Sequence, residues 1–261
     1  MPGQSSVTRT KCRWEHGVQI FYNGVTNETV HAMAPYWFKD DFTGLVGQVT
    51  AADVGLTWAP IDVSAAGNTT PIILPGTAAT GATGVVNLMM AVGNNEAQDS
   101  GIYWADQTPL NPYNDLQIEF RLALVDAIGG NTTAMWGVEG LHNADGDTVA
   151  ESAWFRVTGD QVLLTESDDT TNDESNTSAI TLVASEYHIF RIDFGDMADV
   201  KFFMDGTRVN AGSTHDMTNL TAAEAMFQPI IKMDHGAVAE AGSLYLDAVT
   251  IWGTRTSYRD D

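Results

Sequence analysis

The chain has 261 residues, of which 34 are acidic and 12 basic, giving a formal net charge of −22 at pH 7. Such a surface repels nucleic acid and anionic membranes, and no apolar run approaches the roughly 18 residues that span a bilayer. Cys12 is the only cysteine, so an intrachain disulfide is excluded. With 44% hydrophobic residues the chain can bury one large core, and we expect neither nucleic acid binding nor membrane insertion.

Residues 1–37 differ in composition from the rest, and we expect them to form an N-terminal arm that anchors the protein to a partner. Three of the twelve basic residues fall within positions 9 to 13. The apolar stretch behind them predicts a strand that ends in an Asn-Gly turn. The candidate docking residues are Arg9, Lys11, Arg13, Val18, Ile20 and Tyr22.

The next part of the chain predicts β-strands rather than helices. Residues 45–115 contain only short apolar runs, separated by stretches rich in Gly, Ala, Thr, Asn and Pro. Residues 116–124 alternate strictly between apolar and polar side chains, as a strand with one face in a core does. Residues 133–141 and 153–157 flank a turn-forming cluster and predict a hairpin.

The following strand covers residues 161–165 and is expected to run into an acidic loop over 166–176. Alternating apolar residues over 187–194 and 200–204 predict two further strands, and the second reaches Asp205-Gly206, a dipeptide suited to a tight hairpin turn. Residues 220–226 predict a short helix. Residues 243–252 predict a closing strand.

Several of these segments resemble concanavalin A-like jelly rolls, the superfamily of lectins, laminin-G domains and laminarinases. Residues 187–209 resemble its "WHxYRIxF…VxFYVDGxxV" segment, residues 38–42 its "F-x-D-D-F" entry, and residues 244–252 its "LxVDYVxVW" closing strand. The resemblance implies an all-β, concanavalin A-like jelly-roll β-sandwich over residues 38–255, preceded by the extended arm and followed by a tail at 256–261.

The laminarinase-type glucanases of this superfamily carry Glu-x-Asp-x-(x)-Glu on one strand, because hydrolysis with retention needs two carboxyl groups about 5 to 5.5 Å apart. The nearest match here begins at Glu166 and Asp168, but the second glutamate is replaced by Thr170 or Thr171. The broken motif leads us to expect no catalytic residues and no enzymatic activity.

Glycan binding requires aromatic faces and planar polar groups. The candidate glycan-binding residues are Tyr103, Trp104, Asp106, Tyr113 and Trp154, although aromatic side chains also fill sandwich cores and oligomer interfaces. Asn143, Asp145 and Asp147 place oxygen atoms at every second position, as calcium loops do, and are candidate calcium ligands. A turn between strands explains the same three residues, and no other metal or cofactor is expected.

Other segments resemble jelly-roll proteins of tailed-virus particles, in which "FWG…/…FRV.GD…/…YH.FRIDF…VKFFMDG" recurs. Here residues 135–137, 155–160 and 187–206 match. The resemblance predicts a non-enzymatic structural protein on the virion surface, a head decoration or fibre module. We expect it to be a homo-oligomer that contacts the major capsid protein or other virion proteins. The alternatives are an adhesion module for a host-surface glycan and a divergent glycoside hydrolase.

Overall fold

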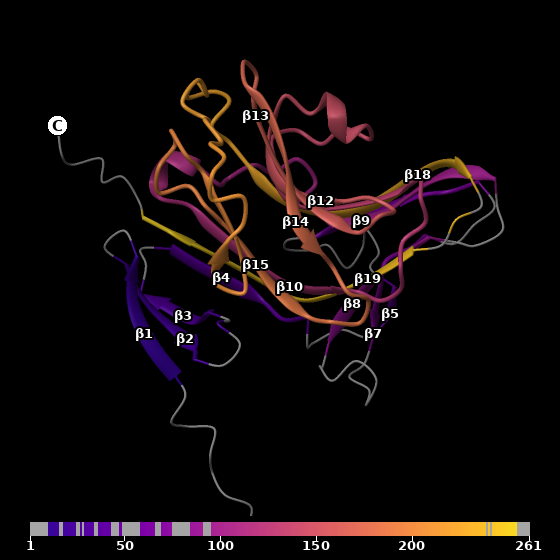
Figure 1. The fold of residues 1–261 in the computed structure, drawn as a ribbon, viewed down its shortest axis with the longest axis horizontal. Coiled ribbons are helices and arrows are strands. Elements are labelled where there is room, and N and C mark those ends of the chain that lie inside the picture. The colour runs from indigo at the N-terminus through magenta and orange to yellow at the C-terminus, as the bar shows by residue number, and fades with distance from the viewer. Residues whose placement is uncertain are drawn as a thin grey trace, which may run out of the picture.

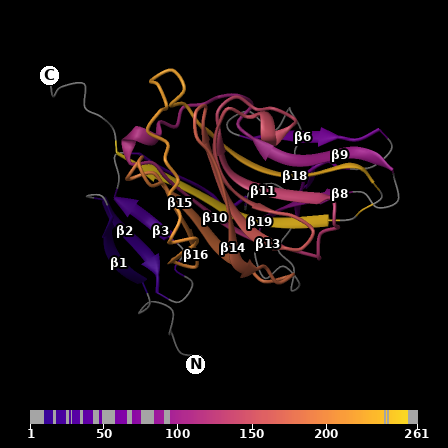
Figure 2. The same cartoon turned by 45° about the horizontal axis from the view of Figure 1, so that its top comes forward.

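The computed structural model describes residues 10–15, 18–24, 27, 29–33, 36–42, 47–48, 58–65, 69–74, 84–90, 95–238, 240 and 242–254. Two large antiparallel sheets face each other, and a small third sheet lies beside them (Figures 1 and 2). This arrangement confirms the predicted jelly-roll β-sandwich. The strands are β1 (Thr10–Glu15), β2 (Val18–Asn23), β3 (Thr29–Met33), β4 (Tyr36–Asp40), β5 (Gly47–Gln48), β6 (Ala59–Val63), β7 (Ile72–Leu74), β8 (Val85–Met90), β9 (Glu96–Tyr103), β10 (Gln117–Leu124), β11 (Thr132–Glu139), β12 (Glu151–Val157), β13 (Val162–Asp169), β14 (Asp173–Thr181), β15 (His188–Asp193), β16 (Lys201–Met204), β17 (Thr207–Arg208), β18 (Gln228–Val238) and β19 (Gly242–Gly253).

The nine-stranded sheet has the order β17-β16-β15-β10-β19-β8-β7-β5, with β4 also paired to β19. The closing strand β19 therefore lies at its centre: it pairs with β10 on one side and with β8 and then β4 on the other. The seven-stranded sheet has the order β14-β13-β12-β11-β18-β9-β6. Its outer face carries the candidate site described below.

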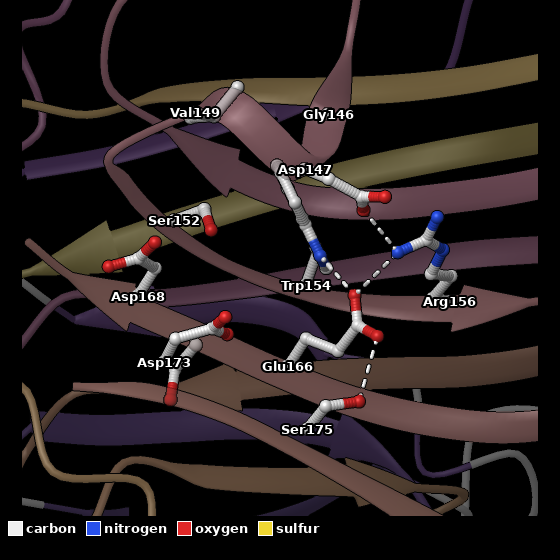
Figure 3. Close-up of a pocket in the computed structure, with 11 residues that line it drawn as sticks. Gly146, Asp147, Val149, Ser152, Trp154, Arg156, Glu166, Asp168, Asp173 and Ser175 are labelled. Carbon is white, nitrogen blue, oxygen red and sulfur yellow. Dashed lines mark hydrogen bonds and ion pairs between the residues drawn. The ribbon is translucent and has the colours of Figure 1, made fainter.

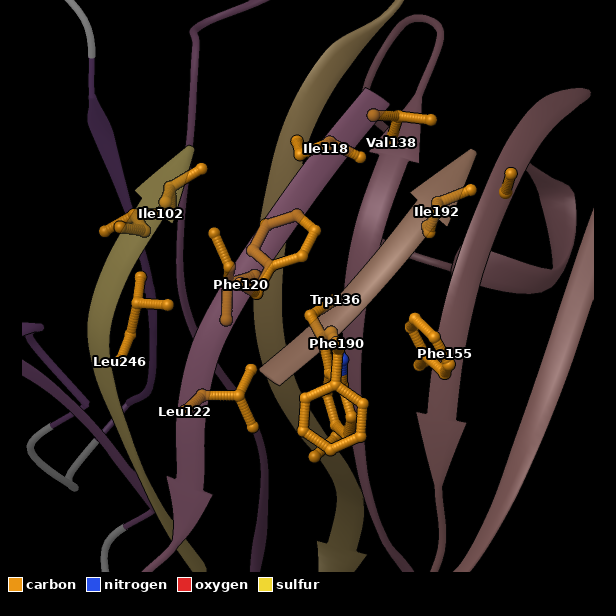
Figure 4. Close-up of a cluster of buried hydrophobic side chains, with 14 of the residues drawn as sticks. Ile102, Ile118, Phe120, Leu122, Trp136, Val138, Phe155, Phe190, Ile192 and Leu246 are labelled. Carbon is orange, nitrogen blue, oxygen red and sulfur yellow. The ribbon is translucent and has the colours of Figure 1, made fainter. Parts of the chain in front are cut away.

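The core fills the space between the two sheets, and the alternation predicted for residues 116–124 and 187–194 sends large side chains into it (Figure 4). The rings of Phe155 and Phe190 meet edge to face with their centres 5.1 Å apart, and Trp136 stacks on Phe155 at 6.0 Å. All three residues are fully buried. Contacts of this kind add to the burial of apolar surface that drives sandwich formation.

The predicted turn at Asp205-Gly206 is confirmed, because both residues have positive φ angles, 51° and 79°. Two other predictions are wrong. Residues 166–176 are mostly strand, since β13 continues to Asp169 and β14 starts at Asp173. The backbones of these polar residues pair in register, and side chains such as Ser175 and Glu166 also hydrogen-bond across the two strands. Residues 220–226 form a turn, because an isolated apolar stretch of this length cannot sustain a helix.

The described arm residues from Thr10 to Met33 contribute the small sheet, in which β2 pairs with β1 and β3, whereas Tyr36 and Trp37 belong to β4 of the nine-stranded sheet. The small sheet contacts the nine-stranded sheet through Thr29, which donates two hydrogen bonds to Glu119 on β10, and through the Asn27 amide, which donates to the Asp205 carbonyl at 2.9 Å. That residues 1–37 are a separable anchor stays a prediction. Among the described residues, no helix has the length and apolar character needed to cross a membrane.

Candidate functional site

A cavity of about 230 Å³ opens on the outer face of the seven-stranded sheet (Figure 3). Its walls come from β12, β13 and β14 and from a short 3-10 helix, η3 (Gly146–Thr148). The alternation of β12 explains its lining: Ala153, Phe155 and Val157 face the core, so Trp154 and Arg156 face outward.

Glu166 is the carboxylate of this cavity that accepts the most hydrogen bonds. It pairs in register with Trp154 on β12 and with Ser175 on β14. Its Oε2 accepts from Trp154 Nε1 at 2.9 Å and from Arg156 Nη1 at 3.4 Å, and its Oε1 accepts from Ser175 Oγ at 2.9 Å (Figure 3). Three donors from two neighbouring strands thus fix the position of the carboxylate and stabilise its charge.

Arg156 joins Glu166 to the 3-10 helix, because its Nη1 also donates to Asp147 Oδ1 at 2.6 Å. Burial alone would lower the pKa of Arg156, but the hydrogen bond that Arg156 donates to Asp147 and the charge of Glu166 outweigh it, and the pKa is raised. The guanidinium stays charged and bridges the two carboxylates.

Asp168 lies two residues after Glu166 on the same face of β13 and is paired in register with Asp173 of β14. Burial raises the pKa of Asp168, the hydrogen bond from the Thr170 backbone opposes the rise, and the charges of Asp173 and Asp169 add to it. The cavity therefore holds one carboxylate that is hydrogen-bonded to Arg156 and one whose pKa is raised.

The loop that contains η3 packs against the outer face of the seven-stranded sheet. Val149, Met135, Ile61 and Ile230 form a small apolar cluster with Trp154 on this outer face. Gly137 pairs with Trp154, and an added Cβ there would lie 2.2 Å from the Ala153 carbonyl oxygen and 2.5 Å from the Trp154 Cα, so only glycine lets β11 approach β12 this closely. The cluster holds Trp154 with 3% of its surface exposed.

The candidate calcium ligands form this loop. The Asn143 side chain accepts from the backbone of Asp145, the Asp145 side chain accepts from that of Asp147, and Asp147 is paired with Arg156. These are the hydrogen bonds of a turn. Across the part of the chain that the structure describes, no group of three or more His, Cys, Asp or Glu side chains is arranged to hold a metal ion.

A second polar group lies on the same outer face, near Tyr103. The ring of His142 lies 4.8 Å from that of Tyr103, and its Nδ1 lies 2.9 Å from Glu139 Oε1. Burial raises the pKa of Glu139, while the hydrogen bond and charge of His142 oppose the rise. Asp106 accepts from the backbone of His142 and from the side chain of Gln228.

The structure separates the candidate glycan-binding residues. Tyr103, Asp106 and Trp154 lie on or beside the outer face, although Trp154 is buried there rather than facing water. Trp104 belongs to the main core, where it contacts Phe38 edge to face. Tyr113 is 46% exposed on another part of the surface and donates to the Leu220 carbonyl.

The docking candidates that the structure describes lie on β1 and β2 of the small sheet. Arg9 and the side chain of Val18 lie outside the described residues. Lys11 is exposed, whereas the Arg13 guanidinium lies 4.6 Å from the centre of the Tyr22 ring. Ile20 is fully buried.

Sequence reasoning missed Arg156, Glu139 and His142 as members of these clusters. The alternation of β12 indicated that Arg156 faces outward, but its partner Glu166 could be found only from the strand register. His142 follows β11 by three residues and reaches Glu139 through the turn, a contact that strand periodicity does not predict.

No protein-family model and no curated protein matches the chain. Solved structures do match. A mixed-linkage glucan GH16 protein of Bacteroides ovatus, in complex with a product, is 13% identical, with a TM-score of 0.58 over 82% of this chain and 99% of that one. A β-1,3-glucanase of Mycobacterium marinum is 15% identical, with a TM-score of 0.55 over 84% and 100%. A pseudo β-1,3-glucanase of Mycobacterium tuberculosis is 13% identical, with a TM-score of 0.52 over 84% and 98%.

The chain has the concanavalin A-like jelly-roll fold. The prediction that it is not an enzyme is contradicted by the same comparison, because named glucanases are among the matching structures. The prediction rested on the missing second glutamate of a single motif, at Thr170 or Thr171.

Proposed function

We propose that the protein is a glycoside hydrolase that binds a carbohydrate chain across the outer face of the seven-stranded sheet. The observation that carries the proposal is the pair of outward carboxylates on β13. Glu166 is held by three donors, one of them the charged Arg156, and Asp168 has a raised pKa. Two carboxyl groups in such different environments are the usual basis for acid and base roles.

In this proposal Asp168 protonates the leaving oxygen of the glycosidic bond, and Glu166 acts as nucleophile or as the base that activates water. The Cα atoms of two residues that are two positions apart on a strand lie about 6.6 Å apart. The two carboxyl groups of glycosidases are separated by a similar distance, roughly 5 to 9.5 Å. The Trp154 indole and Ser175 hydroxyl fix Glu166 and so preserve this spacing. The glucanases among the structural neighbours support carbohydrate as the substrate class.

The test is the release of reducing sugar from β-1,3-glucan and mixed-linkage glucan. Glu166→Gln and Asp168→Asn should each lower the turnover number about 100-fold or more, as expected for loss of an acid–base group. The matched controls are Glu186→Gln and Asp126→Asn, which change exposed carboxylates outside the cavity and should leave turnover unchanged.

The pH dependence of the same assay tests the roles. Because Asp168 must be protonated, turnover should fall as the pH rises through its raised pKa, and the Asp168→Asn variant should lose that limb. Glucan binding without turnover by the wild type would favour the adhesion module instead. Equal turnover by wild type and Glu166→Gln would refute the assignment.

We also propose that the small sheet docks the protein onto a virus particle. β1 is an edge strand of that sheet, and on it Lys11 is exposed and Trp14 is 70% exposed. A cation and an apolar ring beside an open strand edge favour docking by charge pairing and strand addition. Salt-sensitive co-sedimentation with purified particles, lost on deletion of residues 1–36, would support this role; co-sedimentation that survives the deletion would refute it.

A further inference from the structure

The loop between β11 and β12, residues 140–150, covers the middle of the outer face of the seven-stranded sheet. Its Val149 packs in one apolar cluster with Ile61 of β6, Met135 of β11 and Ile230 of β18. Gly146 lies directly on Met135, because an added Cβ there would lie 3.0 Å from the Met135 Cε. Ile230 is only 1% exposed although it lies outside the sandwich core, so the loop covers this part of the face.

Two side chains of β18 also hold the loop through hydrogen bonds. The Lys232 ammonium donates to the Ala144 carbonyl, and the Gln228 amide donates to the Gly140 carbonyl at 2.9 Å. Lys232 and Gln228 are both buried. If the loop moved away, each would lose a buried hydrogen-bond partner, so these contacts oppose its opening.

The loop forms one wall of the cavity that contains the outward carboxylates. Of the described strand residues, those that line this cavity all belong to β12, β13 or β14, and the loop contributes Gly146, Asp147 and Val149. Figure 3 shows Gly146 and Val149 on one side of the cavity and Ser175, which is exposed, on the other. The cavity therefore opens toward β14 and ends at the loop.

An ion pair closes the cavity at a second place. Asp147 in the loop accepts from Arg156 of β12 at 2.6 Å, so the two side chains bridge the space between the loop and the sheet. At about 230 Å³ the cavity is also smaller than the roughly 300 to 1,000 Å³ of clefts that enclose drug-sized ligands. The closed walls and the small volume leave room for one sugar ring beside the carboxylates, and a chain cannot continue over β11 and β18.

We propose, on the basis of the hydrolase function proposed above, that this site acts on the end of a carbohydrate chain and releases one sugar at a time. The terminal ring occupies the cavity beside Glu166, and the rest of the chain leaves over β14. The glycosidic C–O bond breaks, and the departing oxygen takes the Asp168 proton. Water supplies the hydroxyl of the released sugar and the proton that returns to the carboxyl pair.

The first products of a defined oligosaccharide test the position of cleavage. Wild-type protein is incubated with a β-1,3-linked glucose hexasaccharide, and the products are followed over time by mass spectrometry. Glucose and the pentasaccharide should appear first. Early release of disaccharide, trisaccharide and tetrasaccharide together would show internal cleavage, which refutes chain-end action and leaves the hydrolase proposal in place. Release of no sugar at all would refute the hydrolase proposal.

A binding measurement decides the shape of the site without turnover. Glu166→Gln keeps the shape of the side chain, and calorimetry measures the affinity of this variant for β-1,3-linked glucose oligomers of increasing length. A cavity for one ring predicts that the trisaccharide and the hexasaccharide bind equally, within about twofold. Binding that tightens about 3- to 10-fold with each added sugar, the effect of one further hydrogen bond, would indicate a continuous groove and refute the proposal. Failure of every oligomer to bind would also refute it.

Replacing residues 141–150 by Asn-Gly should open the face. The Gly140 N–H donates to the Glu151 carbonyl at 2.8 Å, so a two-residue hairpin turn can join the strands at this point. The variant should produce disaccharide and trisaccharide early from the hexasaccharide. Leu141→Ser changes a loop residue that is 68% exposed, and as the matched control it should keep the wild-type products.

A folded loop variant that still releases only glucose would show that the loop does not determine where the chain is cut. If the loop variant does not fold, the wild-type products and the Glu166→Gln affinities decide the proposal by themselves.

Discussion

Glu119 on β10 accepts two hydrogen bonds from Thr29 on β3, 90 residues away in the chain. The backbone N–H of Thr29 lies 2.8 Å from Oε1, and its hydroxyl lies 3.0 Å from Oε2. Both residues are buried, Glu119 with 4% of its surface exposed. A polar position that faces away from the sandwich core is thus covered by the small sheet, and the pair joins the arm to the domain.

Replacing Thr29 by valine should destabilise the protein. The variant keeps the backbone donor and the shape of the side chain but removes the hydroxyl, so Oε2 of the buried carboxylate loses its partner. We expect the free energy of unfolding to fall by about 1 to 3 kcal/mol in urea titration. Thr181→Val, at an exposed position of β14, is the control and should change it by less than about 0.5 kcal/mol. Equal effects would show that the hydroxyl does not stabilise the contact.

Glu119 should also make stability depend on pH. Burial raises its pKa above the ordinary value near 4.5, and the hydrogen bonds from Thr29 and the charge of Arg191 only partly offset the rise. The folded state therefore holds the proton more tightly than the unfolded state, so this contribution to stability is full below about pH 4.5 and is lost as the pH rises through the raised pKa.

The comparison of wild type with Glu119→Gln isolates this effect. Glutamine retains the shape and stays neutral, so its free energy of unfolding relative to wild type should increase from pH 4 to pH 7. Chemical unfolding at several pH values measures the difference. A difference that stays constant over this range would show that Glu119 titrates normally.

Much of the fold follows from local patterns. The strict alternation at residues 116–124 and the Asp205-Gly206 dipeptide each have one physical explanation, and both predictions were right. The acidic stretch 166–176 has two possible explanations, because a run of Ser, Thr, Asp and Glu suits a solvated loop as well as an edge strand. Only the pairing of β13 with β12 and with β14 distinguishes the loop from the strand.

The candidate site was harder to predict because it depends on register. Glu166 meets Trp154 and Ser175 only because β13 lies between β12 and β14 with these residues opposite one another. A shift of one residue would turn Glu166 into the core. The separation of Tyr103 from Trp104 follows from the same alternation, since neighbours on a strand point to opposite faces.

His215 should make the protein sensitive to acid. Its ring is buried between two hydroxyl groups, with Nε2 2.9 Å from Thr165 Oγ1 and Nδ1 2.9 Å from Ser167 Oγ. Burial lowers its pKa to about 4, so the folded state favours the neutral ring. The stability this provides is present above pH 6.5 and is lost as the pH falls toward 4, by about 3 kcal/mol in total.

The imidazole resonances of His215 should titrate near pH 4 in NMR, and His215→Gln should lose less stability than wild type between pH 6.5 and 4. The two hydroxyl partners remain available to the glutamine amide, which keeps the fold comparable. A titration midpoint near 6.5 would contradict the assignment.

Arg13 and Lys11 lie on the same strand but should differ in their effect on stability. The Arg13 guanidinium lies over the Tyr22 ring, and its charge helps to lower the pKa of Glu119. Arg13→Ser should therefore reduce the free energy of unfolding by about 0.5 to 2 kcal/mol, through the lost cation–π contact and the lost positive charge. Lys11→Ser, at an exposed position, should change it by less than about 0.5 kcal/mol.

This difference decides which variant can test docking. If the small sheet attaches the protein to a particle by charge, Lys11→Ser should weaken co-sedimentation in low salt while the melting temperature stays unchanged. The effect should disappear near 1 M salt, where the Debye length is about 3 Å. Equal losses of stability in the Lys11 and Arg13 variants would contradict the structural distinction. Unchanged co-sedimentation of Lys11→Ser in low salt would show that this lysine does not contribute to docking.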